Sequence, residues 1–117
     1  MPLQDLYIGL GSLAYTVAKA DGKLQQEESM LLEKVLQQTL HGEIALYAFQ
    51  LKEAYNSDIE EAYQFAMRRF TENKKHFDLE TKREFFQILR QVAESYDGIS
   101  KKEQALLKRC KRDMEKI

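Results

Sequence analysis

The chain has little of what secreted, membrane-spanning and loop-rich proteins require. It holds one cysteine, one proline, five glycines and no tryptophan among its 117 residues. A lone cysteine excludes an internal disulfide, and no apolar run approaches the roughly 20 residues that span a bilayer. Residues 1–5 lack the basic and apolar regions of a signal peptide. We therefore expect a cytoplasmic protein without membrane insertion, in which few turns connect long elements.

What the chain does contain is enough apolar and charged residues for one folded domain. Apolar residues make up 44% of the sequence and charged residues 32%, which is too apolar for a disordered chain. The apolar residues recur at three- and four-residue steps, and no stretch alternates in the manner of a strand. The sequence therefore predicts a single all-α domain over residues 1–117, folded as a compact bundle of about six helices.

Helix boundaries follow from this spacing and from short polar or glycine-containing segments. The predicted helices cover about residues 3–20, 25–40, 43–55, 57–70, 79–96 and 100–116. Three of them begin at side chains that suit a helix N-terminus, namely Ser57 with Glu60 as a capping box, Asp78, and Ser100 with Glu103 as a second capping box. The third helix is expected to turn the following residues toward the core: Ile44, Tyr47, Ala48, Leu51 and Tyr55.

An internal repeat is the most informative pattern in the chain. Residues 17–28 and 92–103 lie 75 positions apart, and each copy contains an Asp-Gly pair followed by a glutamate. The residues concerned are Asp21, Gly22 and Glu28 in the first copy, and Asp97, Gly98 and Glu103 in the second. The second Asp-Gly pair is displaced by one position, so its loop is one residue shorter. Two such helix-loop-helix units can face each other across a pseudo-symmetric core and share a ligand.

These four acidic residues carry the most specific chemistry in the sequence. Calcium, magnesium and manganese prefer carboxylate oxygens, so clustered carboxylates indicate one of these ions rather than zinc. An alternative needs no metal, because each glutamate also suits the third position of its helix and each aspartate suits a turn. A self-sufficient EF-hand is excluded, since Val17 and Lys19 would occupy ligand positions of its loop.

The repeat also resembles a known family. A helix that ends in Ala-x-Ala-Asp-Gly, followed by an apolar residue and a glutamate, resembles the TerB-like family of tellurite-resistance and DjlA-type co-chaperone domains. The matching segments are residues 18–24 with Glu28 and residues 97–100 with Glu103. The resemblance extends over essentially the whole chain. It implies a helical bundle whose two Asp-Gly loops hold a divalent metal through Asp21, Glu28, Asp97 and Glu103.

No catalytic motif is found in the sequence. It lacks a His-Glu-x-x-His pair, a phosphate-binding glycine loop and a nucleophile elbow. His41 and His76 lie at predicted helix boundaries, where surface or capping roles are expected, and Cys110 shares the apolar side of the last helix. The charge is uneven, −6 over residues 1–61 and +5 over residues 62–117. The basic last helix therefore raises the hypothesis of weak nucleic-acid binding.

The sequence thus favours a non-enzymatic module that binds a divalent cation between two acidic loops. The family resemblance associates such a module with stress response or tellurite resistance. A protein-interaction domain of co-chaperone type, with an unidentified protein partner and no metal, is the first alternative. Nucleic-acid binding through the basic last helix is the second alternative.

Overall fold

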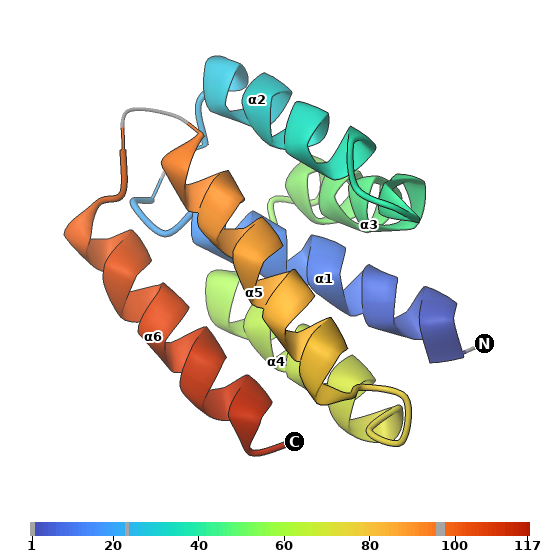
Figure 1. Cartoon of the computed structure of the whole chain (residues 1–117). Helices are drawn as coiled ribbons and strands as arrows, with labels where there is room; N and C mark the ends of the chain where they lie inside the picture. The colour runs from blue at the N-terminus through green and yellow to red at the C-terminus, as the bar shows by residue number, and fades with distance from the viewer. Residues whose placement is uncertain (1, 23, 96–97) are drawn as a thin grey trace.

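The computed structural model describes residues 2–22, 24–95 and 98–117, and these residues form six helices and no strand (Figure 1). The helices are α1 (Pro2–Ala18), α2 (Gln26–Gln37), α3 (Gly42–Ala54), α4 (Ile59–Glu72), α5 (Leu79–Glu94) and α6 (Lys101–Glu115). The prediction of an all-α bundle of about six helices is confirmed. The first two helices end two and three residues earlier than predicted, and the predicted end of the fifth helix at Tyr96 lies outside the described residues.

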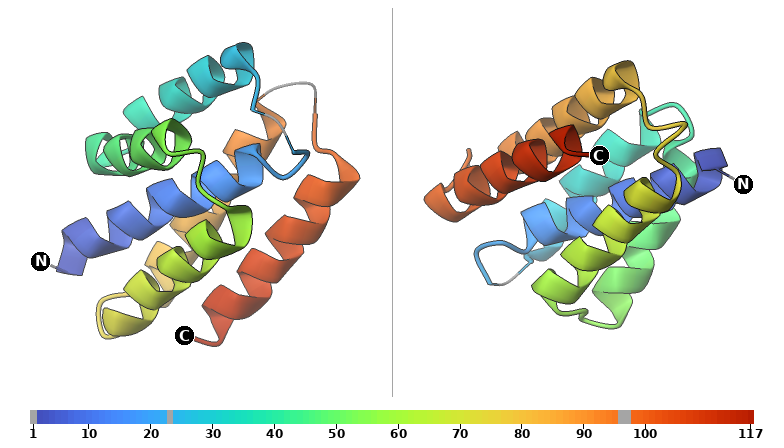
Figure 2. Two further views of the ribbon diagram at one scale, coloured as in Figure 1. Left: turned by 180° about the vertical axis from the view of Figure 1, so that it is seen from behind. Right: turned by 90° about the horizontal axis from the view of Figure 1, so that it is seen from below.

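Helix α1 lies at the centre of the bundle (Figure 2). It contacts all five other helices and is buried almost without interruption from Leu6 to Ala18. Glycine permits this close packing, because a Cβ on Gly11 would lie only 2.9 Å from the Cβ of Ala48 on α3. The buried hydroxyl of Ser12 donates to the carbonyl of Ala62 on α4 at 2.9 Å. Helix α1 is therefore the element on which the other five helices assemble.

The inward face of α3 differs from the predicted one. Tyr47, Leu51 and Tyr55 are 64%, 41% and 80% exposed. The buried residues of α3 are Gly42, Ala45, Ala48 and Phe49. The close approach of the α1 and α3 backbones at Gly11 explains why Ala45 and Ala48 face α1, since only small side chains fit at that point. The alanines therefore turn toward α1, and the helix period directs the tyrosines to the outside.

Side-chain caps begin α4, α5 and α6, although the cap of α4 differs from the predicted one by one residue. Asp58 caps α4 by accepting a 3.0 Å hydrogen bond from the backbone N–H of Glu61. The predicted capping box of Ser57 and Glu60 is therefore wrong by one position, because two adjacent residues both suit a cap and the aspartate is the one in cap geometry. The predicted cap of α5 at Asp78 is confirmed.

Candidate metal centre

Both acidic loops turn through a glycine in the left-handed region of backbone conformation. Gly22 has a φ of 102° and Gly98 a φ of 78°, values that a residue with a Cβ rarely adopts. The C-terminal ends of α1 and α5 and the first turns of α2 and α6 lie at the same end of the bundle (Figures 1 and 2). The repeat thus brings its two loop regions together, as the sequence predicts.

A hydrogen-bonded link joins the two copies through Ser100. Its hydroxyl donates to Oδ1 of Asp21 at 2.9 Å and accepts from the backbone N–H of Glu103 at 3.1 Å. The carboxylate of Glu103 in turn accepts from the Ser100 backbone N–H at 2.9 Å, which completes the predicted capping box. The sequence identifies Ser100 only as a cap, because its bond to Asp21 joins residues 79 positions apart.

Glu28 holds the equivalent position in the first copy, where the cap is only partial. Gln25 stands where Ser100 stands in the second copy, and its side chain makes no capping hydrogen bond. The backbone of Gln25 is still near enough to the Glu28 carboxylate to lower its pKa in part. Capping is therefore complete at α6 and partial at α2, although both helices carry the glutamate that the repeat predicts.

Three of the four predicted acidic residues come close enough to perturb one another. Glu103 is 7% exposed, and burial raises its pKa, with smaller increases from the charges of Asp21 and Glu28. Burial likewise raises the pKa of Glu28, and Asp21 adds to the increase. Within residues 2–22, 24–95 and 98–117, no lysine or arginine forms an ion pair with these three carboxylates. A proton or a cation would relieve this repulsion.

The cluster is not a closed coordination shell. In the part of the chain that the structure describes, no group of three or more His, Cys, Asp or Glu residues lies close enough to hold a metal ion. Asp97, the fourth predicted ligand, lies outside the described residues. Among the described residues the structure links Asp21 to Glu103 through Ser100, but it does not gather Asp21, Glu28 and Glu103 into a ready-made coordination group.

A comparison with protein families identifies the family to which the chain belongs. The family model described as tellurite resistance protein TerB matches residues 8–114. The chain belongs to this TerB family. The match spans both loops and at least part of every helix, and it confirms the resemblance expected from the repeat. No match is found among the curated proteins or among the solved structures.

In this TerB-family chain, polar side chains attach the basic last helix to α4. Arg109 donates two hydrogen bonds to Glu60, at 2.8 and 2.7 Å, and its guanidinium lies 3.8 Å from the centroid of the Tyr63 ring. The Tyr63 hydroxyl donates to Asp113 at 2.6 Å. The hydrogen bonds from Arg109 are the main reason that the pKa of Glu60 falls to about 2. Arg109 therefore positions α6 instead of presenting a free charge to solvent.

The histidines and the cysteine of this TerB-family chain lie apart from the acidic cluster. Cys110 is buried, and burial raises the pKa of its thiol to about 12. His41 precedes α3, and its ring centroid lies 5.5 Å from that of Tyr7. His76 is exposed in the turn between α4 and α5. These positions agree with the structural roles expected from the sequence.

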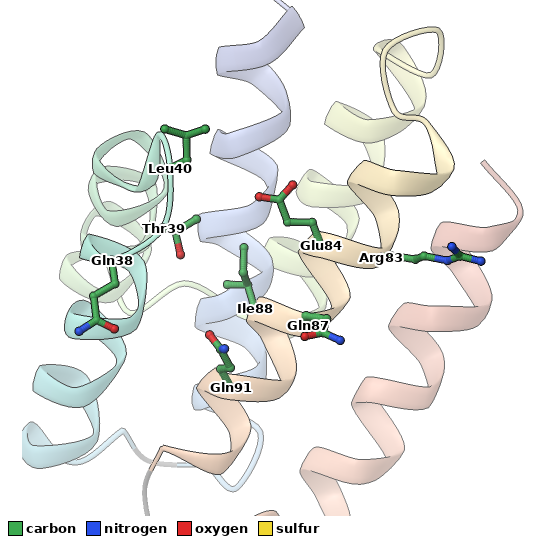
Figure 3. A pocket seen from close by; sticks show the side chains of 8 residues that line it. All are labelled: Gln38, Thr39, Leu40, Arg83, Glu84, Gln87, Ile88 and Gln91. Atoms are coloured by element: carbon green, nitrogen blue, oxygen red, sulfur yellow. The ribbon is translucent and has the colours of Figure 1, made fainter.

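A cleft between the end of α2 and α5 contains none of the predicted site residues (Figure 3). It has a volume of about 500 Å³ and is lined by Gln38, Thr39, Leu40, Arg83, Glu84, Gln87, Ile88 and Gln91. In Figure 3 the side chains of Glu84 and Ile88 point toward α2, whereas Arg83 points toward α6.

Among the described residues, no helix of this TerB-family chain has both the length and the apolar character for a membrane crossing.

Proposed function

We propose that this TerB-family module binds a divalent cation where its two acidic loops meet. Asp21 and Glu28 from the first copy and Glu103 from the second would supply ligands, together with Asp97 as the sequence predicts. The proposal rests on one observation: the Ser100 hydroxyl donates to Asp21 of the first copy at 2.9 Å and accepts from the backbone N–H of Glu103 in the second copy at 3.1 Å, so an acidic residue of each copy lies beside the same serine. Such a cluster gains free energy from a bound cation because repulsion between the carboxylates becomes attraction to the ion.

The donor set fits a hard cation. All of its atoms are carboxylate oxygens, which calcium, magnesium and manganese prefer, whereas zinc more often binds cysteine and histidine. One oxygen of Glu103 accepts the Ser100 backbone N–H, and the other remains as a donor, because an ionised carboxylate offers about four lone-pair sites. A bound cation would join α2 to α6 and so hold the two repeat copies together.

This module would act by binding rather than by catalysis. The raised pKa of the Cys110 thiol keeps it protonated near neutral pH, and a protonated thiol is a poor nucleophile. We expect the module in the cytoplasm, where cation binding would change its stability or its affinity for a partner. The description of the matching family connects this role with tellurite resistance, and hence with stress response.

Thermal unfolding of chelator-stripped protein tests the proposal. Calcium, magnesium or manganese at about 100 times its Kd should stabilise the native state by about 2.7 kcal/mol. Zinc serves as a comparison ion. The variants Asp21→Asn and Glu103→Gln should lose this increase, while Glu72→Gln, which removes an exposed carboxylate at the end of α4, should retain it. An increase of the same size in all three variants would refute the site.

Proton competition provides a second readout of the same site. Because the pKa values of Glu28 and Glu103 are raised, protons compete with the cation at a higher pH than they would at ordinary carboxylates. The cation-dependent increase in Tm should therefore shrink as the pH is lowered toward these pKa values. A cation effect that does not change over this range would place the ion elsewhere.

A protein-interaction function without metal is the second candidate. It is favoured by the exposed apolar residues Tyr47, Leu51 and Tyr55 on α3. The absence of any cation effect on Tm would leave the acidic residues as caps and make this candidate the better one. Nucleic-acid binding has less support, because Arg109 and Arg112 of α6 form ion pairs within the chain.

A further inference from the structure

The second copy of the repeat carries an open groove between α5 and α6. The residues that line it are Leu79, Lys82, Arg83, Phe86 and Gln87 of α5, with Lys111, Met114 and Glu115 of α6. The groove has a volume of about 610 Å³, which is within the range of pockets that bind ligands. The side chain of Leu79 is 60% exposed, so apolar surface remains uncovered at this position.

The repeat shows what covers the equivalent surface in the first copy. At the offset of 75 residues, Phe86, Lys111 and Met114 correspond to Gly11, Leu36 and Thr39. Gly11 lies against α3, since a Cβ there would be 2.9 Å from the Cβ of Ala48. Leu36 and Thr39 lie at the turn that joins α2 to α3, where a Cβ on Gly42, the first residue of α3, would contact the backbone of Leu36 and lie 3.2 Å from the Cβ of Thr39. Helix α3 therefore covers in the first copy a surface that remains open in the second.

The helix–helix contacts on the inner sides of the two copies correspond, which supports aligning α1 and α2 with α5 and α6. Helix α5 contacts both α1 and α2, and in the same way α1 contacts both α5 and α6. Helix α3 contacts both α1 and α2 on their other side. On the outer side, the groove of the second copy has the position that α3 has in the first.

Charges beside the groove indicate the chemistry of a missing helix. Lys82, Arg83 and Lys111 form no ion pair with any described residue, whereas Arg109 and Arg112 of α6 do. The ammonium group of Lys111 lies 5.9 Å from the centroid of the Phe86 ring. Cations and apolar surface are therefore adjacent, an arrangement that is complementary to carboxylates flanking an apolar side chain.

We propose that the groove between α5 and α6 binds an acidic amphipathic helix of a partner protein. This helix would lie on α5 and α6 as α3 lies on α1 and α2. Its apolar side chains would cover Leu79 and Phe86, and its carboxylates would approach Lys82, Arg83 and Lys111. Helices that bind in grooves use apolar anchors at positions i, i+3, i+4 and i+7.

The form of the groove favours a helix over a membrane or a nucleic acid. The exposed Leu79 lies in the groove with the half-buried Phe86, above the buried Met114. An anionic membrane or a duplex could reach the lysines at the edge while leaving this apolar surface unburied. A helix with protruding apolar side chains can satisfy both parts of the site, and the burial of those side chains would supply most of the affinity.

The test uses a fluorescein-labelled synthetic helical peptide with leucines at i, i+3, i+4 and i+7 and glutamates on its other faces. Fluorescence anisotropy measures its binding to the full chain, and amide NMR spectra of the ¹⁵N-labelled chain locate the contact. We expect saturable binding, with shifts along α5 near Lys82 and Phe86 and along α6 near Lys111 and Met114. Absence of saturable binding, or shifts confined to other helices, would overturn the proposal.

Two charge-reversal variants separate a specific groove from general attraction. Lys82→Glu with Lys111→Glu should weaken peptide binding by about tenfold or more, because two attractive contacts become repulsive. Lys34→Glu with Lys101→Glu makes the same change in net charge at exposed positions outside the groove, and it should change the affinity by no more than about twofold, as screening weakens distant charges. Equal weakening in both double variants would overturn the proposal.

A second peptide and two competitors test the class of partner. Replacing the leucines with serines should weaken binding by about tenfold or more, because the apolar contribution is lost. Equal binding of both peptides would overturn the proposal. Phosphatidylglycerol vesicles or duplex DNA that bind more tightly than the peptide, with the same dependence on Lys82 and Lys111, would assign the groove to that ligand instead. Self-association that requires these two lysines would assign it to a second copy of the chain.

Discussion

The two copies of the repeat have similar sequences but different surroundings. Helix α1 of the first copy is covered by α3 and α4 and contacts every other helix, whereas α5 of the second copy has an exposed side. At corresponding positions, α1 has Gly11 packed against α3 and α5 has Phe86 beside an open groove. The comparison shows that a helix-loop-helix pattern specifies the local unit, while its neighbours decide which copy becomes the centre.

The second helices of the two copies differ in how they are held. Helix α6 has a complete capping box at Ser100 and an ion pair from Arg109 to Glu60 on α4. Helix α2 begins at Gln25 without a side-chain cap, and among the described residues it takes part in no ion pair. Helix α2 therefore depends more than α6 on apolar packing, which it makes through the buried Leu32 and Leu36.

The largest expected effect comes from filling the contact between α1 and α3. Gly11→Ala should lower the free energy of unfolding by about 3 kcal/mol, because the added methyl group would overlap α3. Helix propensity alone has the opposite sign and would stabilise the helix by about 1 kcal/mol. Phe86→Leu, at the corresponding position of α5, should cost only about 1 kcal/mol. Urea unfolding measures the change in unfolding free energy for each of these two variants. A Gly11→Ala variant more stable than the wild-type protein would contradict the close packing of α1 against α3.

A smaller effect is expected from the caps of α2 and α6. Ser100→Ala should destabilise the protein by about 1 kcal/mol, since it removes an N-cap that Gln25 does not provide in the first copy. Gln25→Ala should change the stability by no more than a few tenths of a kcal/mol, which is usual for a surface substitution. Chemical denaturation curves of the two variants give this difference. Equal losses would mean that the two helices are capped equally.

The smallest effect concerns the ion pair between α6 and α4. Glu60→Gln should cost about 0.5 kcal/mol near neutral pH, because Glu60 is largely exposed and solvent screens the pair. The pKa of Glu60 is lowered from 4.5 to about 2, so its contribution is present above pH 4.5 and is lost as the pH falls toward 2. Unfolding curves of the two proteins should therefore converge over this interval. A difference that stays constant down to pH 2 would show that the pair is unimportant.

The parts of the fold that were predicted correctly depend on residues close in sequence. Asp78 and Ser100 cap helices whose first turns they directly precede, and Gly22 and Gly98 supply left-handed turns. The cap of α4 was misplaced because Ser57 and Asp58 are adjacent and chemically similar. These interactions span a few residues, and a sequence pattern describes them without knowledge of the neighbouring helices.

The candidate site could be predicted only in part. The repeat identifies Asp21, Glu28 and Glu103 as acidic residues in corresponding contexts, and the structure links Asp21 to Glu103 through Ser100. The hydrogen bond from Ser100 to Asp21 was missed because the two residues lie in different copies. The groove between α5 and α6 was missed for a related reason, since its walls come from two helices and its openness depends on the position of α3.

The sequence by itself determined the six helices, the duplicated acidic loops and membership of the TerB family. Periodicity, caps and turn glycines are local properties, and each element needs only its own residues to express them. The tertiary structure decided that α1 rather than α5 is central, and that α3 turns its alanines inward and leaves Tyr47 and Tyr55 exposed. These outcomes depend on how closely two backbones approach, because a glycine on one helix determines which side chains of another helix can fit against it.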